Sequence, residues 1–184
     1  MTARPTGHYV LKDDGLYLQF DRLFYAPIED VWFSLTNPNA MRAWIGTYTG
    51  SPATGGVRFR MEAEGEGEWQ NVTILECAAP HRFTADSGSG PTGIRLFCHL
   101  VEGGGMTTLT LGQRLHDRAE SADMGPGWDY YLDRLAAARA GTPQPAWETY
   151  YPAFSRHYRE LEVPTRRAGE GAPGVLRDAA ARQP

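Results

Sequence analysis

Cysteine is scarce in this chain, which has only two in its 184 residues. Cys77 and Cys98 each lie inside an apolar run with the pattern of a strand, and neither has the short spacing or the neighbouring histidines of a zinc site. We therefore expect both thiols to be reduced and to belong to the core.

Long hydrophobic runs are also missing. Residues 1–12 hold no apolar stretch of signal-peptide length, and nowhere do about 18 apolar residues run together as a membrane span requires.

Positive charge is not in excess either, because the formal net charge is −4 and the isoelectric point is near 5.7. Such a field repels nucleic acid and anionic membranes. We expect a cytoplasmic protein whose partners include neither nucleic acid nor a membrane.

Residues that could carry catalysis are few and scattered. The five histidines include no pair at the helical spacing of metal ligands, and no serine stands in a nucleophile-elbow context. His99 could act as an acid or base if it faced a cavity, but a satisfied core histidine is the more common arrangement. His116 and Asp117 more often form an exposed loop pair than a catalytic contact. The sequence therefore predicts no catalytic residue.

Two patterns could suggest a cofactor or a metal, and both have a simpler interpretation. Residues 88–93 match the glycine spacing of a dinucleotide fingerprint, but that motif must open a helix, and the residues that follow have the pattern of a strand. A hairpin loop is the better interpretation. The glutamates at positions 62, 64, 66 and 68 could gather a divalent cation, but they follow Arg58 and Arg60 on what should be one solvated strand face. We predict no cofactor and no metal.

Strand alternation begins at residues 15–24, where Leu16, Leu18 and Phe20 share one face. Two short helices should follow. Pro27 suits the first position of one helix, and Asn37 is a good N-cap for the second, which should end at Gly46 in a left-handed conformation. The expected inward side chains of the two helices are Ile28, Val31, Trp32, Leu35, Met41, Trp44 and Ile45.

Clean alternation resumes at Val57, where Val57, Phe59, Met61 and Ala63 point to one side, and a turn is expected at residues 65–67. Short connections favour an antiparallel meander. Its further strands are expected at residues 68–77, 82–86, 94–101 and 106–115.

The longest helix is expected over residues 125–140, after Gly125-Pro126-Gly127 and before Gly141. Its apolar stripe, Trp128, Leu132 and Leu135, should face the sheet. Pro152 should divide the next apolar segment into two short helical pieces. Residues 1–162 are then one folded domain, and residues 163–184, which are poor in large apolar side chains, are a tail that is flexible or ordered by a partner.

Large aromatic side chains are abundant, with five tryptophans, nine tyrosines and seven phenylalanines. Such flat side chains are difficult to pack into a small core without gaps, and an aromatic-lined space between sheet and helix is the usual form of an apolar ligand site. The aromatic content therefore favours a ligand site. The alternative, that these side chains form only an ordinary core, carries equal weight.

In this order the elements resemble the START-like, helix-grip superfamily, and within it the group similar to the activator of the heat-shock protein 90 ATPase. The likeness covers residues 16–140. It rests on Arg22, Ala26-Pro27, Val31-Trp32, Asn37-Pro38 and Trp44, and then on Gly55-Gly56, residues 72–76, Pro80-His81-Arg82, residues 107–110, Gly127-Trp128, Leu132 and Leu135. The resemblance implies an α+β helix-grip fold, in which a curved antiparallel sheet wraps around a long C-terminal helix and two short helices lie between the first two strands.

The resemblance also implies a cavity, and three functions stay open because relatives of this fold differ in function. The leading expectation is a binding protein, monomeric or dimeric, that holds a small apolar molecule between sheet and helix. The second is a cyclase- or aromatase-like enzyme acting on a polycyclic or acyl substrate, with His99, Arg95 or Tyr131 in the cavity. The third is a co-chaperone-type module that binds a protein partner through an exposed patch. The expected ligand-binding residues are Trp44, Phe59, Trp69, Phe97, His99, Trp128, Tyr131 and Leu132.

Overall fold

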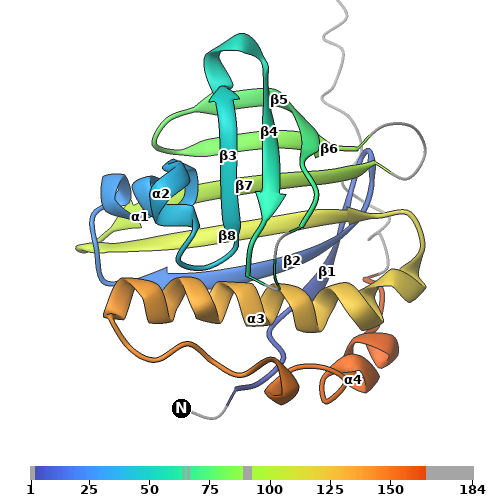
Figure 1. Ribbon diagram of the computed structural model, residues 1–184. Coiled ribbons are helices and arrows are strands. Elements are labelled where there is room, and N and C mark those ends of the chain that lie inside the picture. Colours follow the sequence, from blue (N-terminus) through green and yellow to red (C-terminus); the bar gives the residue numbers. More distant parts are fainter. Residues whose placement is uncertain (1–2, 64, 66, 89–92, 165–184) are drawn as a thin grey trace, which may run out of the picture.

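A strongly curved antiparallel sheet forms the frame of the molecule (Figure 1). The structure is a computed structural model that describes residues 3–63, 65, 67–88 and 93–164. Eight strands follow the order β1-β2-β8-β7-β6-β5-β4-β3. They are β1 (His8–Lys12), β2 (Gly15–Phe24), β3 (Gly46–Ser51), β4 (Gly56–Met61), β5 (Gln70–Ala78), β6 (Arg82–Ser87), β7 (Ile94–Gly103) and β8 (Met106–Leu115).

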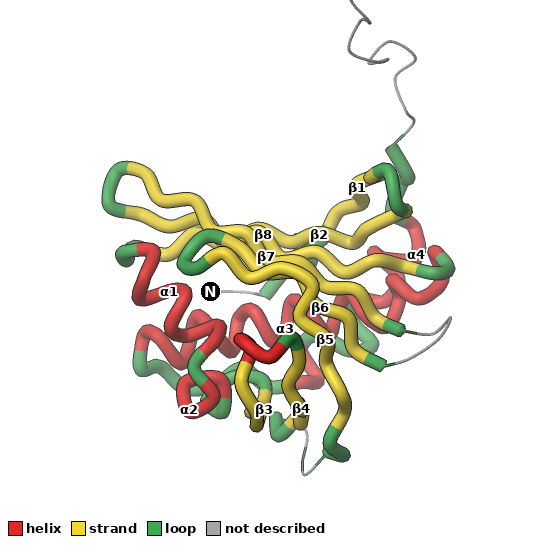
Figure 2. The backbone as a smooth tube through the Cα atoms, turned by 90° about the horizontal axis from the view of Figure 1, so that it is seen from above, coloured by secondary structure: helices red, strands yellow, loops and turns green. Residues whose placement is uncertain are grey.

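The curvature of the sheet separates its two ends. Figure 2 shows β3 and β4 on one side of the molecule and β7 and β8 on the other, with β5 and β6 making the bend. The long helix α3 (Ser121–Ala140) runs along the base of this curve, and α1 (Ile28–Thr36) and α2 (Pro38–Met41) lie at one end of it. The α+β helix-grip architecture predicted from the sequence is confirmed.

Two edge strands were missed by the sequence analysis. β1 pairs with β2 from His8 opposite Gln19 to Lys12 opposite Gly15, so the strand expected to be first is the second. β3 begins at Gly46, which the sequence suggested as the left-handed end of a helix. Gly46 is needed for another reason, since a Cβ there would lie 2.1 Å from the carbonyl oxygen of Arg60 on the paired strand β4. The two short helices therefore lie between β2 and β3.

The N-cap predicted at Asn37 is confirmed, because its side chain accepts hydrogen bonds from the backbone N–H groups of Asn39 and Ala40. The second helix is nevertheless shorter than expected and ends at Met41. Trp44 and Ile45 are still buried, as predicted, but from the turn that leads into β3.

Helix α3 is the longest helix of the described residues, but it begins at Ser121, not at Gly125. Pro126 lies inside the helix and does not precede it. Gly141 has a φ of 63° and ends the helix in the left-handed conformation, as predicted. Leu132 and Leu135 are fully buried in the core, and Trp128 is partly buried against it.

The outer side of α3 is covered by the chain that follows it (Figure 1). Trp147–Thr149 forms a single 3₁₀ turn and Ser155–Glu160 forms α4, which are the two short pieces expected on either side of Pro152. A Cβ at Gly125 would lie 2.3 Å from the Tyr158 ring, so α4 packs directly on the helix backbone. Because α3 is covered on both sides, it lacks a single apolar stripe.

A buried polar cluster joins both ends of the described chain to α3. Asp129 has no exposed surface. It accepts hydrogen bonds from the Thr6 hydroxyl at 2.5 Å and from the Tyr158 hydroxyl, and it pairs with Arg22 of β2 at 3.0 Å. Burial, reinforced by the Asp129 carboxylate, raises the pKa of the Tyr158 phenol, so this hydroxyl remains a donor. Arg22 also reaches Asp133 at 3.2 Å. The cluster therefore fixes α4 and the N-terminal segment against the helix.

Candidate functional site: an apolar cavity between sheet and helix

The concave side of the sheet and α3 enclose a cavity of about 560 Å³. One wall is built by β3, β4 and β5, the opposite wall by β7 and β8, and α3 supplies part of the lining through Met124, Gly127, Trp128 and Tyr131. Helix α1 closes one end with Trp32, Leu35 and Thr36. The volume lies within the range of about 300–1,000 Å³ that is usual for small-molecule sites.

The lining of the cavity is uncharged and mostly apolar. It contains no Asp, Glu, Lys, Arg or His side chain among the described residues. Aromatic, aliphatic and methionine side chains make up most of it, and a few neutral polar groups are placed among them. Those neutral polar groups belong to Thr36, Tyr48, Gln70, Ser87, Gln113, Tyr131 and the two cysteines.

Alternation along the strands explains why the lining is apolar. Val57, Phe59 and Met61 of β4 all face the cavity, as the period-two pattern predicted. On β5 the lining residues are Val72, Ile74 and Cys77, which breaks the period. A β-bulge between Ile74 and Glu76 accounts for this, because the extra residue shifts the side chains that follow to the other face.

The two cysteines are free thiols, and both line the cavity. Cys98 is buried, and burial raises the pKa of its thiol well above the usual range. Cys77 is exposed, so the expectation that both are core residues is wrong for Cys77. The bulge places this residue on the cavity side of β5.

Five of the eight residues predicted to bind a ligand are in the lining: Trp44, Phe59, Phe97, Trp128 and Tyr131. The other three, Trp69, His99 and Leu132, are described by the structure but do not contribute to it. Leu132 is fully buried in the core, where it supports the helix. Whether the lining residues bind a ligand stays a prediction.

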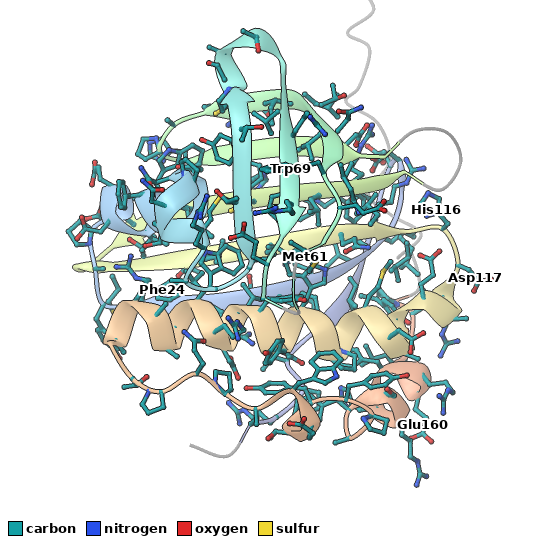
Figure 3. The ribbon with its side chains drawn as sticks, viewed as in Figure 1. Phe24, Met61, Trp69, His116, Asp117 and Glu160 are labelled. Atoms are coloured by element: carbon teal, nitrogen blue, oxygen red, sulfur yellow. The ribbon has the colours of Figure 1, made fainter. Side chains whose placement is uncertain are left out.

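Trp69 contacts the outer side of β4. Its ring, labelled in Figure 3, lies against the guanidinium groups of Arg58 and Arg60, with centroid distances of 5.7 and 4.9 Å. Both arginines alternate along β4 with the cavity-facing residues. Arg60 also forms an ion pair with Glu62 at 2.5 Å. The expected glutamate face is thus partly paired with arginine, and Glu64 and Glu66 lie outside the described residues.

The rings of Phe97 and His99 share the outer side of β7, although Phe97 also borders the cavity. The Phe97 ring covers Gly112, where a Cβ would come within 2.2 Å of it, and the Lys12 ammonium lies 3.4 Å from the ring centroid. The His99 ring is next to it at 5.0 Å and is exposed. Partial burial and the positive charges of Lys12 and Arg82 lower the pKa of His99. These ring contacts lie on the face of β7 opposite the side chains of Leu96 and Cys98, which also line the cavity.

Several lining residues were missed from the sequence, and Gln113 is the most informative of them. It is only 3% exposed, and it stands in β8 at the position that continues the inward row of Leu109 and Leu111. The Trp128 indole N–H donates to its side-chain oxygen at 2.6 Å. A polar residue in an inward row of an alternating strand is the signal that would have found it.

The remaining sequence candidates do not form a site. Asp117 caps the turn before α3 by accepting from the backbone N–H of Ala119, and His116 pairs with Glu120 at 3.7 Å (Figure 3). Gly93 is followed directly by β7, so the glycine-rich loop leads into a strand; its residues 89–92 lie outside the described part. No group of three potential metal ligands occurs among the described residues.

Comparison with known proteins assigns the chain to a family. Residues 25–140, well over half of its length, match the family described as Activator of Hsp90 ATPase homolog 1-like protein. The chain belongs to this family. The comparison with curated proteins found no match. The START-like resemblance stated from the sequence is therefore confirmed at the level of family and fold.

Solved structures share the fold at low sequence identity. CalU16 from Micromonospora echinospora is 22% identical with a TM-score of 0.65, over 87% of this chain and 95% of that one. A protein from Bordetella parapertussis is 23% identical with a TM-score of 0.68, over 89% and 97%. DynU16, a putative protein in the dynemicin biosynthetic locus, is 24% identical with a TM-score of 0.59, over 74% of this chain and 50% of that one.

Among the described residues, no helix is both long enough and apolar enough to span a lipid bilayer.

Proposed function

We propose that this protein binds a small, uncharged, hydrophobic molecule in the cavity between its curved sheet and α3. The observation that carries the proposal is a space of about 560 Å³ whose lining contains no carboxylate and no basic side chain among the described residues. Burying a charge without a partner is strongly unfavourable, so an ionised ligand group would have no compensation here. Apolar contact area is then the main source of affinity.

The likeness to CalU16 and DynU16 supports a role near small-molecule metabolism, because DynU16 belongs to the dynemicin biosynthetic locus. The class of ligand proposed for this chain is inferred from its own cavity and not from those relatives.

An enzymatic function has less support. The sequence suggested His99, Arg95 and Tyr131 as polar groups for an enzyme. Arg95 forms two hydrogen bonds of 2.9 Å with Asp86, and His99 is exposed outside the cavity. Only Tyr131 lines the cavity, and its hydroxyl lies 4.0 Å from the Met61 sulfur. A cyclase or aromatase would therefore have to rely on Tyr131 and on neutral groups.

An exposed patch on the outer face favours protein interaction as a second candidate. Leu23 and Val101 flank Thr108 in register, so both project from the same face of the sheet, and they are 52% and 68% exposed. Tyr25, which follows β2, is 84% exposed. This function gains support if no apolar molecule enters the cavity.

Gly127 offers a direct test of the binding function. It lines the cavity, and a Cβ built there meets no atom within 4 Å, so a larger side chain can grow into the space without a clash at its base. Gly127→Leu should lower the affinity for prodan, a neutral naphthalene ketone dye, by about tenfold or more. The measurement is a fluorescence titration of the dye with the wild-type and variant proteins.

The matched control is Gly127→Ala. It adds only one methyl group, should leave dye affinity near that of the wild type, and should raise the free energy of unfolding by about 0.5–1 kcal/mol because alanine is the better helix former. If prodan does not bind the wild type, or binds Gly127→Leu equally well, the cavity is not the binding site.

A further inference from the structure

Gln113 is an almost fully buried amide that lines the cavity. Its neighbours across the strands are Leu18 of β2 and Leu96 of β7. An amide in such a setting must satisfy its hydrogen bonds, because an unpaired buried polar group is destabilising.

Trp128 fixes the orientation of this amide. Its indole N–H can only donate, and it lies 2.6 Å from Oε1 of Gln113. The oxygen must therefore face Trp128, which leaves the amide nitrogen Nε2 facing Met124. A flipped amide would place two donors against each other.

The amide nitrogen is left with unused hydrogen-bonding capacity. It has two N–H groups, and the Met124 sulfur at 2.8 Å, a weak acceptor, is the only partner that the described part of the chain gives it. Two other polar groups of the lining differ from Gln113. The Tyr48 hydroxyl donates to the carbonyl of Thr36, and Gln70, whose side-chain oxygen accepts from Ser87, is exposed to solvent.

We propose that Gln113 is the polar anchor of the cavity and that the ligand carries a neutral hydrogen-bond acceptor, such as a ketone or quinone oxygen, which accepts an N–H of Gln113. The inference rests on the proposed binding function and narrows the class of ligand. A carboxylate is excluded by the uncharged lining, and a pure hydrocarbon would leave the donor unused. The ligand is thus an uncharged, largely apolar molecule with a carbonyl-type oxygen directed toward β8 and α3.

The test compares two probes that differ in one group. Prodan carries a ketone, and dimethylaminonaphthalene is the same ring system without it. We expect the preference for prodan over its carbonyl-free analogue to be about tenfold greater in the wild type than in Gln113→Met, which keeps the length of the side chain and loses the donor. The affinity for the analogue should hardly change.

A spectroscopic signature separates a hydrogen bond from a change of shape. The emission of prodan moves to longer wavelength when its ketone accepts a hydrogen bond, so dye bound to Gln113→Met should emit at shorter wavelength than dye bound to the wild type. Gln113→Leu is the second variant, because its side chain has a similar length and no hydrogen-bond donor. It should also lose the preference, and circular dichroism checks that both variants are folded.

The outcomes are distinguishable. If both probes bind and the preference is the same in the wild type and in both variants, Gln113 is not the anchor, although the cavity still binds apolar molecules. If neither probe binds the wild type, the anchor and the proposed function are both wrong.

Discussion

Replacing Asp129 with alanine should lower the free energy of unfolding by about 3–5 kcal/mol, as is usual when one partner of a buried ion pair is removed. The carboxylate is fully buried and receives hydrogen bonds from Thr6, Tyr158 and Arg22. Without it, the Tyr158 hydroxyl and the Arg22 guanidinium lose their shared acceptor in a region with little access to water. Chemical denaturation monitored by circular dichroism measures the change.

Asp123→Ala is the matched control for this substitution. Asp123 lies in the first turn of the same helix and is exposed, so its loss should affect the stability by less than about 1 kcal/mol. Similar effects of the two substitutions would mean that the Asp129 cluster does not hold the ends of the chain against α3.

Leu135→Ala should lower the free energy of unfolding by about 2–5 kcal/mol, which is the usual range for a large-to-small change in a core. Leu135 is fully buried and belongs to the same hydrophobic cluster as Leu132 of α3 and Leu18 and Phe20 of β2. The substitution removes apolar contacts and leaves a cavity between the helix and the sheet. Urea titration with tryptophan fluorescence gives the difference in stability.

The same truncation at an exposed position is the control. Leu75 of β5 is 49% exposed, so Leu75→Ala should lower the stability by less than about 1 kcal/mol. A value below about 0.5 kcal/mol for Leu135→Ala would place this side chain at the surface and contradict the packing of α3 on the sheet.

Strands with one buried face could be predicted well from the sequence. The bounds of β2 and β8 agree with the predicted ones, because apolar and polar residues alternate along both. The edge strands β1 and β3 were missed for the opposite reason. β3 has the sequence GTYTGS and is exposed over its second half, so its hydrogen bonds to β4, and not a hydrophobic pattern, define it.

The start of α3 shows a limit of local signals. Gly125 and Pro126 normally mark the end of another element, yet both lie inside the helix. The reason is tertiary packing: the Tyr158 ring lies where a side chain at position 125 would be, so glycine permits the approach of α4. Sequence spacing cannot show a contact between residues 33 positions apart.

The candidate site was predicted in its general character but not in all its residues. Trp44, Phe59, Trp128 and Tyr131 follow from helix and strand periodicity, and all four line the cavity. Trp69 was misplaced because it lies in the connection directly before β5 and not in a regular strand. Gln113 was not among the predicted residues, whose side chains are aromatic, aliphatic or ionisable, although the alternation of β8 places it inward.

Methionine methyl groups provide the most direct test of the binding function. Met41, Met61 and Met124 line the cavity, whereas Met106 lies at the start of β8 outside the lining. In a protein labelled with carbon-13 at the methionine methyl groups, titration with prodan should shift the signals of Met41, Met61 and Met124 in a saturable way and leave that of Met106 unchanged. Saturable dye binding that shifts Met106 but none of the three lining methionines would contradict a ligand site between the sheet and α3.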